Sequence, residues 1–516
     1  MSISQGNILS FAKQLFLALI VYCFLILCLG YEFGSGDQTE FIPLLRDNIL
    51  NGYFKKDFFV QNYLLSGHDV RHGVIATCDI GNRFLELNWW LFILHFLSGM
   101  VMILGGMAVL GHFTKNKALL VAALCIIWGI LYGINLGSNE IYYAQLLPSL
   151  LAKSCLIWAI YFYIKNKITI WPAFVILGSY WQDMAAIQVF LLLTGSNFIV
   201  FFLPWLRRKV SFKNLFKQIN PLPSFVFLGY VIIFIFLKAE LLTSNNTTDS
   251  KPLIDILMWR VGHHFDPALY SLRNYLTFGF VVIPSLFLIY KRNMRIFIFC
   301  ILALTGCLIY ALLYQVFPQI IMTQWFKTTI WVKLICFGAL FIYTMEFIFL
   351  MFGKQRKLNV QAALLTGLLA LGIYKGPLHD VPYQLPFTKA QTDDEVSIAL
   401  LARQKTAKDA LFLIPPDNST FKIWSKRSCF VDYKSTVFDS RVLEDWLSRI
   451  TLVYGISLSD QGGLLAYPKM RARYKDFLQS PTNLNKIVVT HFITEEVLPQ
   501  YTLLGEAGRW RLYKVK

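Results

Sequence analysis

Residues 11–41 read FAKQLFLALIVYCFLILCLGYEFGSGDQTEF. The first 20 of these residues are almost entirely apolar, which is the length needed to cross about 30 Å of hydrocarbon. The run is too long for a signal-peptide core and lacks a small-residue cleavage site, so it predicts a retained membrane helix. A glycine-rich acidic segment, GDQTE at 36–40, follows at once. This stretch therefore predicts a spanning helix that delivers carboxylates to the membrane surface.

Similar apolar runs recur along the first 375 or so residues. Of the 516 residues, 56% are hydrophobic and 15% charged, whereas soluble domains have roughly 25% charged residues. We therefore expect an α-helical polytopic membrane protein. Hydropathy and charge together predict about eleven spans, at 11–31, 89–111, 118–136, 146–164, 168–181, 186–205, 221–238, 272–290, 296–314, 329–352 and 359–375.

The net charge of +18 comes from basic residues that lie between the apolar runs. By the positive-inside rule these loops are cytoplasmic, and an odd number of spans then places the N-terminus inside and the C-terminus outside. Nucleic acid is not an expected partner, because no soluble surface interleaves basic with aromatic residues. The basic clusters are Lys115 with Lys117, Lys165 with Lys167, Arg207 to Lys217, Lys291 to Arg295 and Lys354 to Lys357.

The composition changes near residue 377, where basic and acidic residues come into balance. We predict a transmembrane domain at 1–376, with long outer loops at 32–88 and 239–271, and a small soluble α/β domain at 377–516, outside the cytoplasm. Helices are expected at 392–405 and 440–450. The strand-like runs of this domain are 410–414, 429–433, 486–492 and 511–515.

The first outer loop contains apolar residues at helical spacing, around Arg46 and Asp47. This pattern predicts a helix that lies along the membrane surface. The apolar residues are Phe41, Leu44, Leu45, Ile49 and Leu50.

Asp37 and Glu40 are three residues apart and share a face if their segment is helical. Carboxylates at this place can act as a general base, bind a metal or accept a hydrogen bond from a sugar hydroxyl. A helix cap followed by solvated acids is the alternative. Gln38, between them, is a candidate substrate contact.

The second outer loop contains Arg260, His263 and His264, close to the predicted eighth span. A guanidinium with two imidazoles suits a phosphate or pyrophosphate headgroup. Metal binding with Asp266 and structural hydrogen bonding at the membrane interface remain open.

Other polar residues lie at the outer ends of predicted spans. Glu140, Asp183 and Gln324 belong to this set and could line a shared substrate cavity; simple exposure of each is the alternative. Cys78 and Cys429 are the two cysteines outside the apolar runs, and two unrelated thiols are expected rather than a disulfide.

The order of these parts resembles the glycosyltransferase C superfamily, multi-spanning enzymes that use polyprenyl-phosphate sugars. The segments Gly36-Asp37-Gln38 and Glu40-Phe41, Arg260 with His263-His264, and the tail motifs 410–412, 415–416 and 426–428 resemble a group of uncharacterised bacterial membrane proteins thought to share that fold. The resemblance implies that Asp37 is the catalytic or acceptor-orienting acid. Many members have adjacent acids in this loop, whereas Gln38 follows Asp37 here, so a divalent cation stays an open question.

The expected function is sugar transfer from a polyprenyl-phosphate donor to a glycan, lipid or protein acceptor, at the outer face of a bacterial inner membrane. Asp37 and Glu40 are the predicted catalytic residues. The predicted contacts to lipid phosphate and substrate are Arg260, His263, His264, Gln38, Glu140, Asp183 and Gln324. A transporter or lipid flippase, and a non-catalytic protein of envelope assembly, are the alternatives.

Overall fold

A computed structural model of the 516-residue chain describes residues 5–66, 71–206, 251–376, 383–387 and 393–515, with Phe225, Gly229 and Ile232 described singly. The chain divides into two compact units. The helical unit comprises Met1–Tyr31, Phe92–Phe236 and His263–Tyr383, and the mixed unit comprises Glu32–Leu91, Leu237–Gly262 and Gln384–Lys516. The first predicted outer loop and the part of the second that ends at Gly262 thus group with the C-terminal segment.

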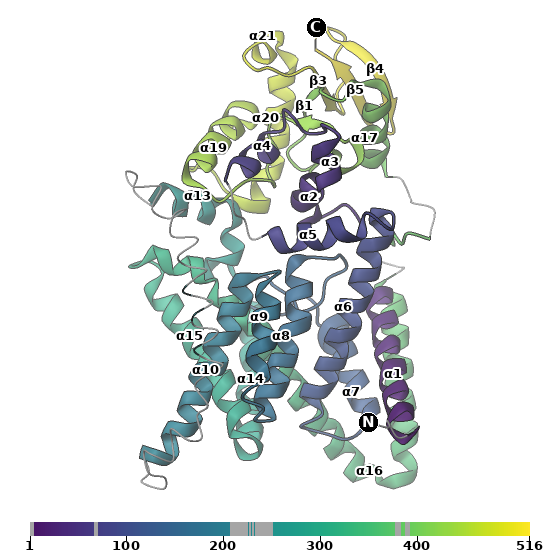
Figure 1. Cartoon of the computed structure of the whole chain (residues 1–516), viewed down its shortest axis with the longest axis vertical. Helices are drawn as coiled ribbons and strands as arrows, with labels where there is room; N and C mark the ends of the chain where they lie inside the picture. The colour runs from purple at the N-terminus through teal and green to yellow at the C-terminus, as the bar shows by residue number, and fades with distance from the viewer. Residues whose placement is uncertain are drawn as a thin grey trace. The chain divides into compact units, whose positions relative to one another are not determined.

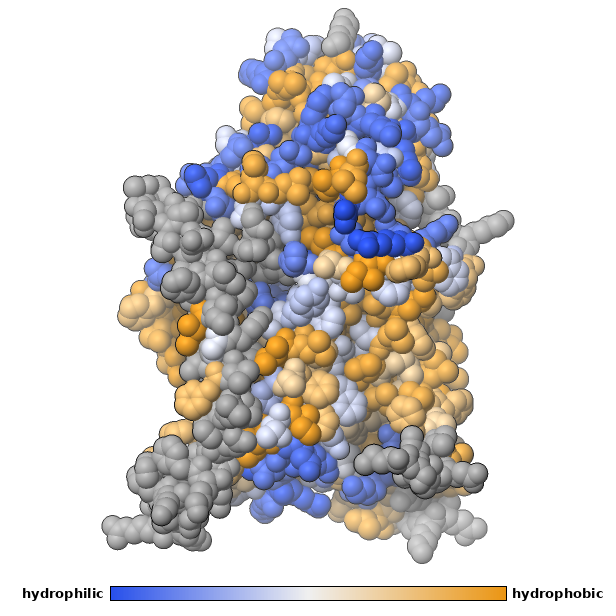
Figure 2. All heavy atoms as spheres, in the orientation of Figure 1, coloured by the Kyte–Doolittle hydropathy of each residue, from blue (hydrophilic) through white to orange (hydrophobic). Residues whose placement is uncertain are grey.

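Seven helices in the described residues are long and apolar enough to cross a membrane, which confirms a helical membrane protein. Figure 2 shows hydrophobic residues over the sides of the helices and hydrophilic residues at their lower ends. The seven candidate spans are Leu9–Leu29, Leu87–Leu110, Asp183–Phe202, Leu272–Arg292, Met294–Leu313, Pro318–Met351 and Leu358–Lys375.

These spans belong to six long helices of Figure 1. The α14 helix packs against α16, and α10 packs against α15. Their bounds are α1 Gln5–Leu29, α6 Leu87–Leu110, α10 Asp183–Leu206, α14 Leu272–Arg292, α15 Met294–Leu313 and α16 Thr329–Lys375.

Three predicted spans correspond to shorter helices. The segment 118–136 forms α7 (Lys117–Leu124) and a π-helical stretch, Cys125–Ile130, and is not helical beyond Ile130. Positive φ angles at Gly133 and Gly137, 87° and 82°, turn the chain there. The other two are α8 (Pro148–Ile164) and α9 (Trp171–Ser179). The predicted span 221–238 lies outside the described residues, apart from three single positions.

The predicted spans 329–352 and 359–375 form one continuous helix, α16, of 47 residues. A straight helix of this length would separate its ends by about 70 Å. Its first residue, Thr329, donates a hydrogen bond to the carbonyl of Leu136, and its last, Lys375, donates to the carbonyl of Gly129. The two ends therefore approach the same short segment, so α16 reverses direction between its two candidate spans (Figure 1).

The mixed unit contains a five-stranded sheet in the order β2-β1-β3-β5-β4. β1 (Leu411–Leu413) pairs in parallel with β2 (Ser428–Cys429) and β3 (His491–Thr494). β3 pairs antiparallel with β5 (Trp510–Lys514), which pairs with β4 (Thr502–Ala507). The small C-terminal sheet domain is confirmed, although the sequence did not predict β4.

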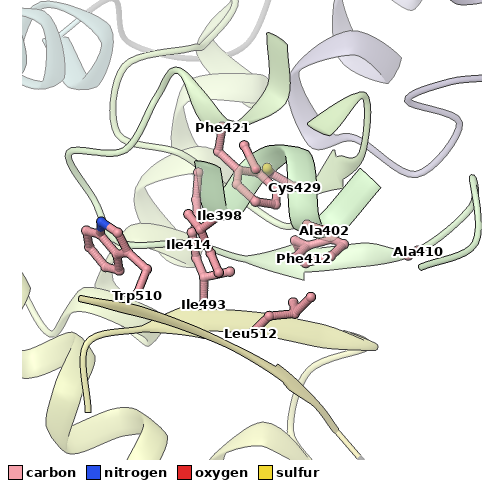
Figure 3. Close-up of a cluster of buried hydrophobic side chains, with 11 residues drawn as sticks. Ile398, Ala402, Ala410, Phe412, Ile414, Phe421, Cys429, Ile493, Trp510 and Leu512 are labelled. Carbon is pink, nitrogen blue, oxygen red and sulfur yellow. The ribbon is translucent and has the colours of Figure 1, made fainter. Parts of the chain in front are cut away.

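Helices cover this sheet, and one apolar cluster fills the space between them. The α17 helix (Asp394–Lys405) contributes Ile398 and Ala402, which lie against Phe412 and Ile493 of the sheet (Figure 3). Trp510 lies at the edge of the cluster. The remaining helices of the segment are α18 Phe421–Ser425, α19 Ser440–Tyr454, α20 Tyr467–Gln479 and α21 Pro481–Leu484.

The apolar residues predicted to face the membrane in the first outer loop are instead mostly buried in the mixed unit. Phe41, Leu44 and Leu45 are at most 5% exposed. Leu44 packs with Phe59 and with Val437 from the C-terminal segment. The apolar face of this loop is therefore covered by protein rather than by lipid. The loop forms α2 Gln38–Phe41, α3 Arg46–Leu50, α4 Phe58–Ser66 and α5 His72–Gly81, and the second outer loop forms α13 Lys251–Val261.

Candidate functional site

The acidic segment after α1 turns sharply before it enters α2. Gly34 and Gly36 have φ angles of 80° and 55°, which glycine adopts at little cost. Asp37 follows as the N-cap residue of α2, and its side chain is 55% exposed. Its Oδ1 lies 3.8 Å from Nζ of Lys434 in the C-terminal segment. Asp37 is thus an accessible carboxylate with one cationic neighbour.

Of the two other predicted site residues in this segment, Gln38 is buried and the Glu40 side chain is 13% exposed. Gln38 accepts a hydrogen bond from the backbone nitrogen of Gly34 at 2.7 Å, which holds the turn together. Glu40 accepts two hydrogen bonds on Oε2 from Arg71, at 3.0 Å from Nε and 2.5 Å from Nη2. Its Oε1 lies 3.9 Å from Nη2 of Arg260. Glu40 is therefore held between two guanidinium groups.

Arg260, the predicted phosphate ligand, is buried among protein partners. It donates from Nε to the carbonyl of Tyr433 at 3.2 Å and from Nη2 to the carbonyl of Lys434. Its guanidinium lies 5.5 Å from the ring centroid of Trp446. Burial lowers the pKa of Arg260, and the nearby Glu40 raises it in part. These contacts tie α13 to the segment after β2.

His263 and His264 belong to the helical unit by contrast with Arg260. Their rings lie 4.1 Å apart between centroids, and Nδ1 of His264 lies 3.3 Å from the carbonyl of Gly137. Burial, with Lys327 and His263 adding to it, lowers the pKa of His264 well below its ordinary value. A neutral His264 ring lacks the charge that the predicted phosphate contact uses.

A second buried ion cluster in the mixed unit connects the first outer loop to the sheet. Nζ of Lys422 lies 2.6 Å from Oδ2 of Asp432 and 3.9 Å from Oδ1 of Asp57, and none of these side chains is more than 2% exposed. Asp57 also accepts hydrogen bonds from the backbone nitrogens of Val60 at 3.0 Å and Cys429 at 2.8 Å. The Asp57 carboxylate thus caps the N-terminus of α4 and accepts a hydrogen bond from the backbone of β2.

In the helical unit, Glu140 lies in the loop between α7 and α8 and is paired with a lysine of α16. Its carboxylate is 3.0 Å and 3.1 Å from Nζ of Lys333 and accepts further hydrogen bonds from Asn135 and the backbone of Gly133. The backbone carbonyl of Glu140 accepts a hydrogen bond from Lys153 of α8 at 2.5 Å. Glu140 therefore organises a buried polar cluster among the helices.

A cavity of the helical unit borders this cluster. Lys153 is 1% exposed and donates to Oδ1 of Asn139 at 3.1 Å, while Gln188 donates to the backbone carbonyl of Gln324 at 3.0 Å. Asp183, at the start of α10, lies next to two lining residues in the sequence but does not line the cavity itself. The described residues that line it are Asn139, Lys153, Gln182, Met184, Ala185, Gln188, Gln324, Lys327, Ile330 and Trp331, among which there is no carboxylate.

Asp37 and Glu40 are poorly arranged for a divalent cation. Asp37 lies beside Lys434, and Glu40 lies between Arg71 and Arg260, so each carboxylate faces a cation. Within the described residues, no three His, Cys, Asp or Glu side chains gather as a metal site. Cys78 and Cys429 are both buried free thiols.

Comparison with known proteins reaches only a small part of the chain. Residues 393–453 match the family model of a domain of unknown function, DUF6798. This segment runs from the N-cap of α17 into α19 and carries Lys422, Asp432 and Lys434. No curated protein matches the chain.

Several residues at these sites were missed from the sequence. Lys153 and Lys333 are isolated lysines inside apolar runs, and that isolation is a usable signal because a charge in a spanning segment is costly unless it is paired. Arg71 and Lys434 carry no such signal. Each lies among ordinary polar residues, and its partner in the first outer loop is distant in the chain.

Proposed function

We propose that the protein is a membrane glycosyltransferase of a bacterial envelope, with a glycosyltransferase C-like fold and about eleven spans. It takes a sugar from a polyprenyl-phosphate donor and transfers it to a glycan, lipid or protein acceptor. The reaction occurs at the outer face of the inner membrane, with the N-terminus in the cytoplasm and the C-terminal segment outside.

The observation that carries this proposal is the lining of the cavity in the helical unit. Lys153 and Lys327 supply two ammonium groups, and Asn139 with three glutamines supplies amides, without a carboxylate among the described lining residues. Ammonium groups suit a phosphate, and amides suit the hydroxyl groups of a sugar. The space among these side chains is about the size of one water molecule, so in this proposal the donor binds only as the lining side chains move apart.

Asp37 is the proposed general base of the reaction, because it is the more accessible of the two predicted catalytic residues. Its carboxylate takes the proton of the acceptor hydroxyl as that oxygen bonds to the anomeric carbon. The bond from the anomeric carbon to the phosphate oxygen breaks, and the lipid phosphate leaves with its negative charge. In this proposal Glu40 positions the loop through Arg71 and takes no proton.

The test is sugar transfer by the purified protein in liposomes, from a panel of radiolabelled polyprenyl-phosphate sugars. We expect Asp37→Asn to abolish transfer while donor binding is retained. We expect Lys327→Met to weaken donor binding about 10- to 100-fold, the loss of one charge-assisted contact of about 1.5–3 kcal/mol.

The matched control for Asp37 is Asp476→Asn, because Asp476 also forms an exposed ion pair at 3.8 Å, with Arg473. The control for Lys327 is Lys115→Met, at an exposed lysine of a basic loop. Full transfer by Asp37→Asn would refute the role of that carboxylate. Movement of the labelled lipid across the bilayer without a new covalent bond would refute transfer and favour a flippase.

A further inference from the structure

The end of α5 and the turn after it present apolar side chains outward, in contrast to the buried face of α2 and α3. Phe84 is 80% exposed, Ile80 58%, Leu85 43% and Trp89 37%. The Trp89 ring lies 6.1 Å from the ring of Phe387, which is itself exposed. We call Ile80, Phe84, Leu85, Trp89 and Phe387 the apolar patch.

The patch is held rigidly by contacts on its inner side. The backbone nitrogens of Phe84 and Leu85 both donate to the carbonyl of Gly81, at 2.9 Å and 3.0 Å. A Cβ at Gly81 would lie 1.9 Å from the ring of Trp90, so the turn packs directly on the first turn of α6. Trp90 in turn donates from Nε1 to the carbonyl of Thr77 of α5 at 3.1 Å. The exposed side chains therefore belong to an ordered turn.

The position of the patch in the chain indicates what covers it. The candidate span of α6 begins at Leu87, so Phe84 and Leu85 precede the membrane-crossing segment by three and two residues. At 1.5 to 3.5 Å per residue, they lie within about 10 Å of its first turn. Aromatic and leucine side chains with an adjacent arginine, here the exposed Arg83, are typical of the headgroup region of a bilayer.

We propose that the apolar patch is a membrane anchor, inserted at the headgroup–acyl boundary of the same bilayer that α6 crosses. The anchor fixes the distance between the bilayer surface and the acidic segment that contains Asp37 and Glu40. Arg71, the N-cap residue of α5, holds Glu40 at the other end of the same helix. Lipid contact at residues 80–89 thus sets how far from the bilayer the segment with Asp37 and Glu40 lies. This inference does not depend on sugar transfer.

The test places a nitroxide spin label at Phe84→Cys in a Cys23→Ala background, since Cys23 is the exposed native thiol and the other eight are buried. The protein is reconstituted in liposomes of phosphatidylethanolamine and phosphatidylglycerol. Collision with oxygen, which concentrates in lipid, is compared with collision with a water-soluble nickel chelate. Leu85→Cys repeats the measurement at a second position, in case one variant fails to fold.

Val488→Cys is the matched control, an apolar side chain of the mixed unit that is 84% exposed and far in sequence from any span. Leu97→Cys, inside α6, gives the value for lipid. We expect the oxygen-to-nickel ratio at Phe84 and Leu85 to lie several-fold above that at Val488 and to approach that at Leu97. A ratio equal to that at Val488 would overturn the proposal. Low collision with both reagents would also overturn it, because a protein partner would then cover the patch.

Discussion

The buried ammonium of Lys422 shows how a single side chain can join two distant parts of the chain. Burial alone lowers the pKa of Lys422, but the carboxylates of Asp432 and Asp57 outweigh it, so its net pKa is raised. A buried charge that keeps its partners is tolerated, whereas removing one partner leaves the others uncompensated. Lys422 is therefore expected to matter far more for stability than a surface lysine.

We predict that Lys422→Met destabilises the mixed unit by about 3–5 kcal/mol, because Asp57 and Asp432 remain buried without their cation. Cys429 is fully buried beside them, so its rate of reaction with a maleimide reports opening of this region. Peptide mass spectrometry should show labelling of Cys429 accelerated about 100-fold or more.

Lys469→Met is the control for that variant. Lys469 pairs with Asp460 at the surface, and exposed pairs contribute about 0–1 kcal/mol. Its Cys429 should react within a few-fold of the wild-type rate. Equal rates for Lys422→Met and the wild type would show that the Lys422 cluster does not hold this region closed.

The acids and cations of these sites differ in how far the sequence could predict them. Asp37 and Glu40 stand out because they directly follow a membrane helix. Their partners do not, because Lys434 and Arg71 reach them through folding of separate segments. Arg260 was predicted as a site residue, but as a contact to a phosphate ligand. In the structure it donates hydrogen bonds to the carbonyls of Tyr433 and Lys434, which composition could not predict.

Helices were easier to predict than the loops and strands between them. The ends of α1, α6, α14 and α15 could be predicted because charged or turn-forming residues lie on both sides of each apolar run. β4 was missed because Leu503 and Leu504 are followed by Gly505, and a bulge between Leu503 and Gly505 interrupts the two-residue alternation. The predicted surface helix failed because its apolar face could equally pack against protein, as it does on Val437.

The central strand β3 contains a histidine that should make the mixed unit sensitive to acid. His491 stacks on Phe412 with ring centroids 5.2 Å apart. Burial, with Lys514 and Arg427 adding to it, lowers the pKa of His491 from 6.5 to about 4. Between these pH values the unfolded chain binds a proton at His491 that the folded chain does not, so stability falls as the pH drops through this window.

We predict that the apparent melting temperature of the detergent-solubilised protein falls more steeply from pH 7 to pH 5 in the wild type than in His491→Gln. Intrinsic tryptophan fluorescence during heating is the measurement. The other titrating groups are common to both proteins, so the difference in pH dependence isolates His491. Parallel pH profiles would contradict the prediction, whatever the absolute stability of the variant.

The division of the whole chain into two units was the hardest feature to predict. Sequence analysis separates residues 1–376 from 377–516 by composition, because hydropathy changes there. Composition cannot reveal that the described parts of 32–91 and residues 251–262 group with the C-terminal segment, since their polar residues are typical of any predicted outer loop. The contacts that unite them, such as Asp57 with Cys429, join residues more than 350 positions apart.

This grouping leads us to predict that residues 384–516, which include the segment matching DUF6798, do not fold independently. Expressed alone, residues 384–516 would lose Asp57 opposite Lys422 and the apolar cover that Phe59 and Val60 give to Val437. A buried cation would lack one partner, and an apolar surface would face water. We therefore predict that 384–516 aggregates or stays partly unfolded alone, and that co-expression with residues 32–66 yields a soluble complex.

The decisive measurement is copurification of the two segments, followed by the rate at which Cys429 is labelled in each preparation. Asp57→Leu in the shorter segment should prevent rescue, because it removes both the ion pair with Lys422 and the hydrogen bond from the Cys429 backbone. Asp47→Asn should rescue normally, since Asp47 is exposed and bonds to Asn82 outside that segment. If residues 384–516 alone were soluble and protected Cys429, this segment would fold without the first outer loop, and the prediction would be wrong. The buried charges of that loop would then contribute to the placement of Asp37 and Glu40 rather than to folding.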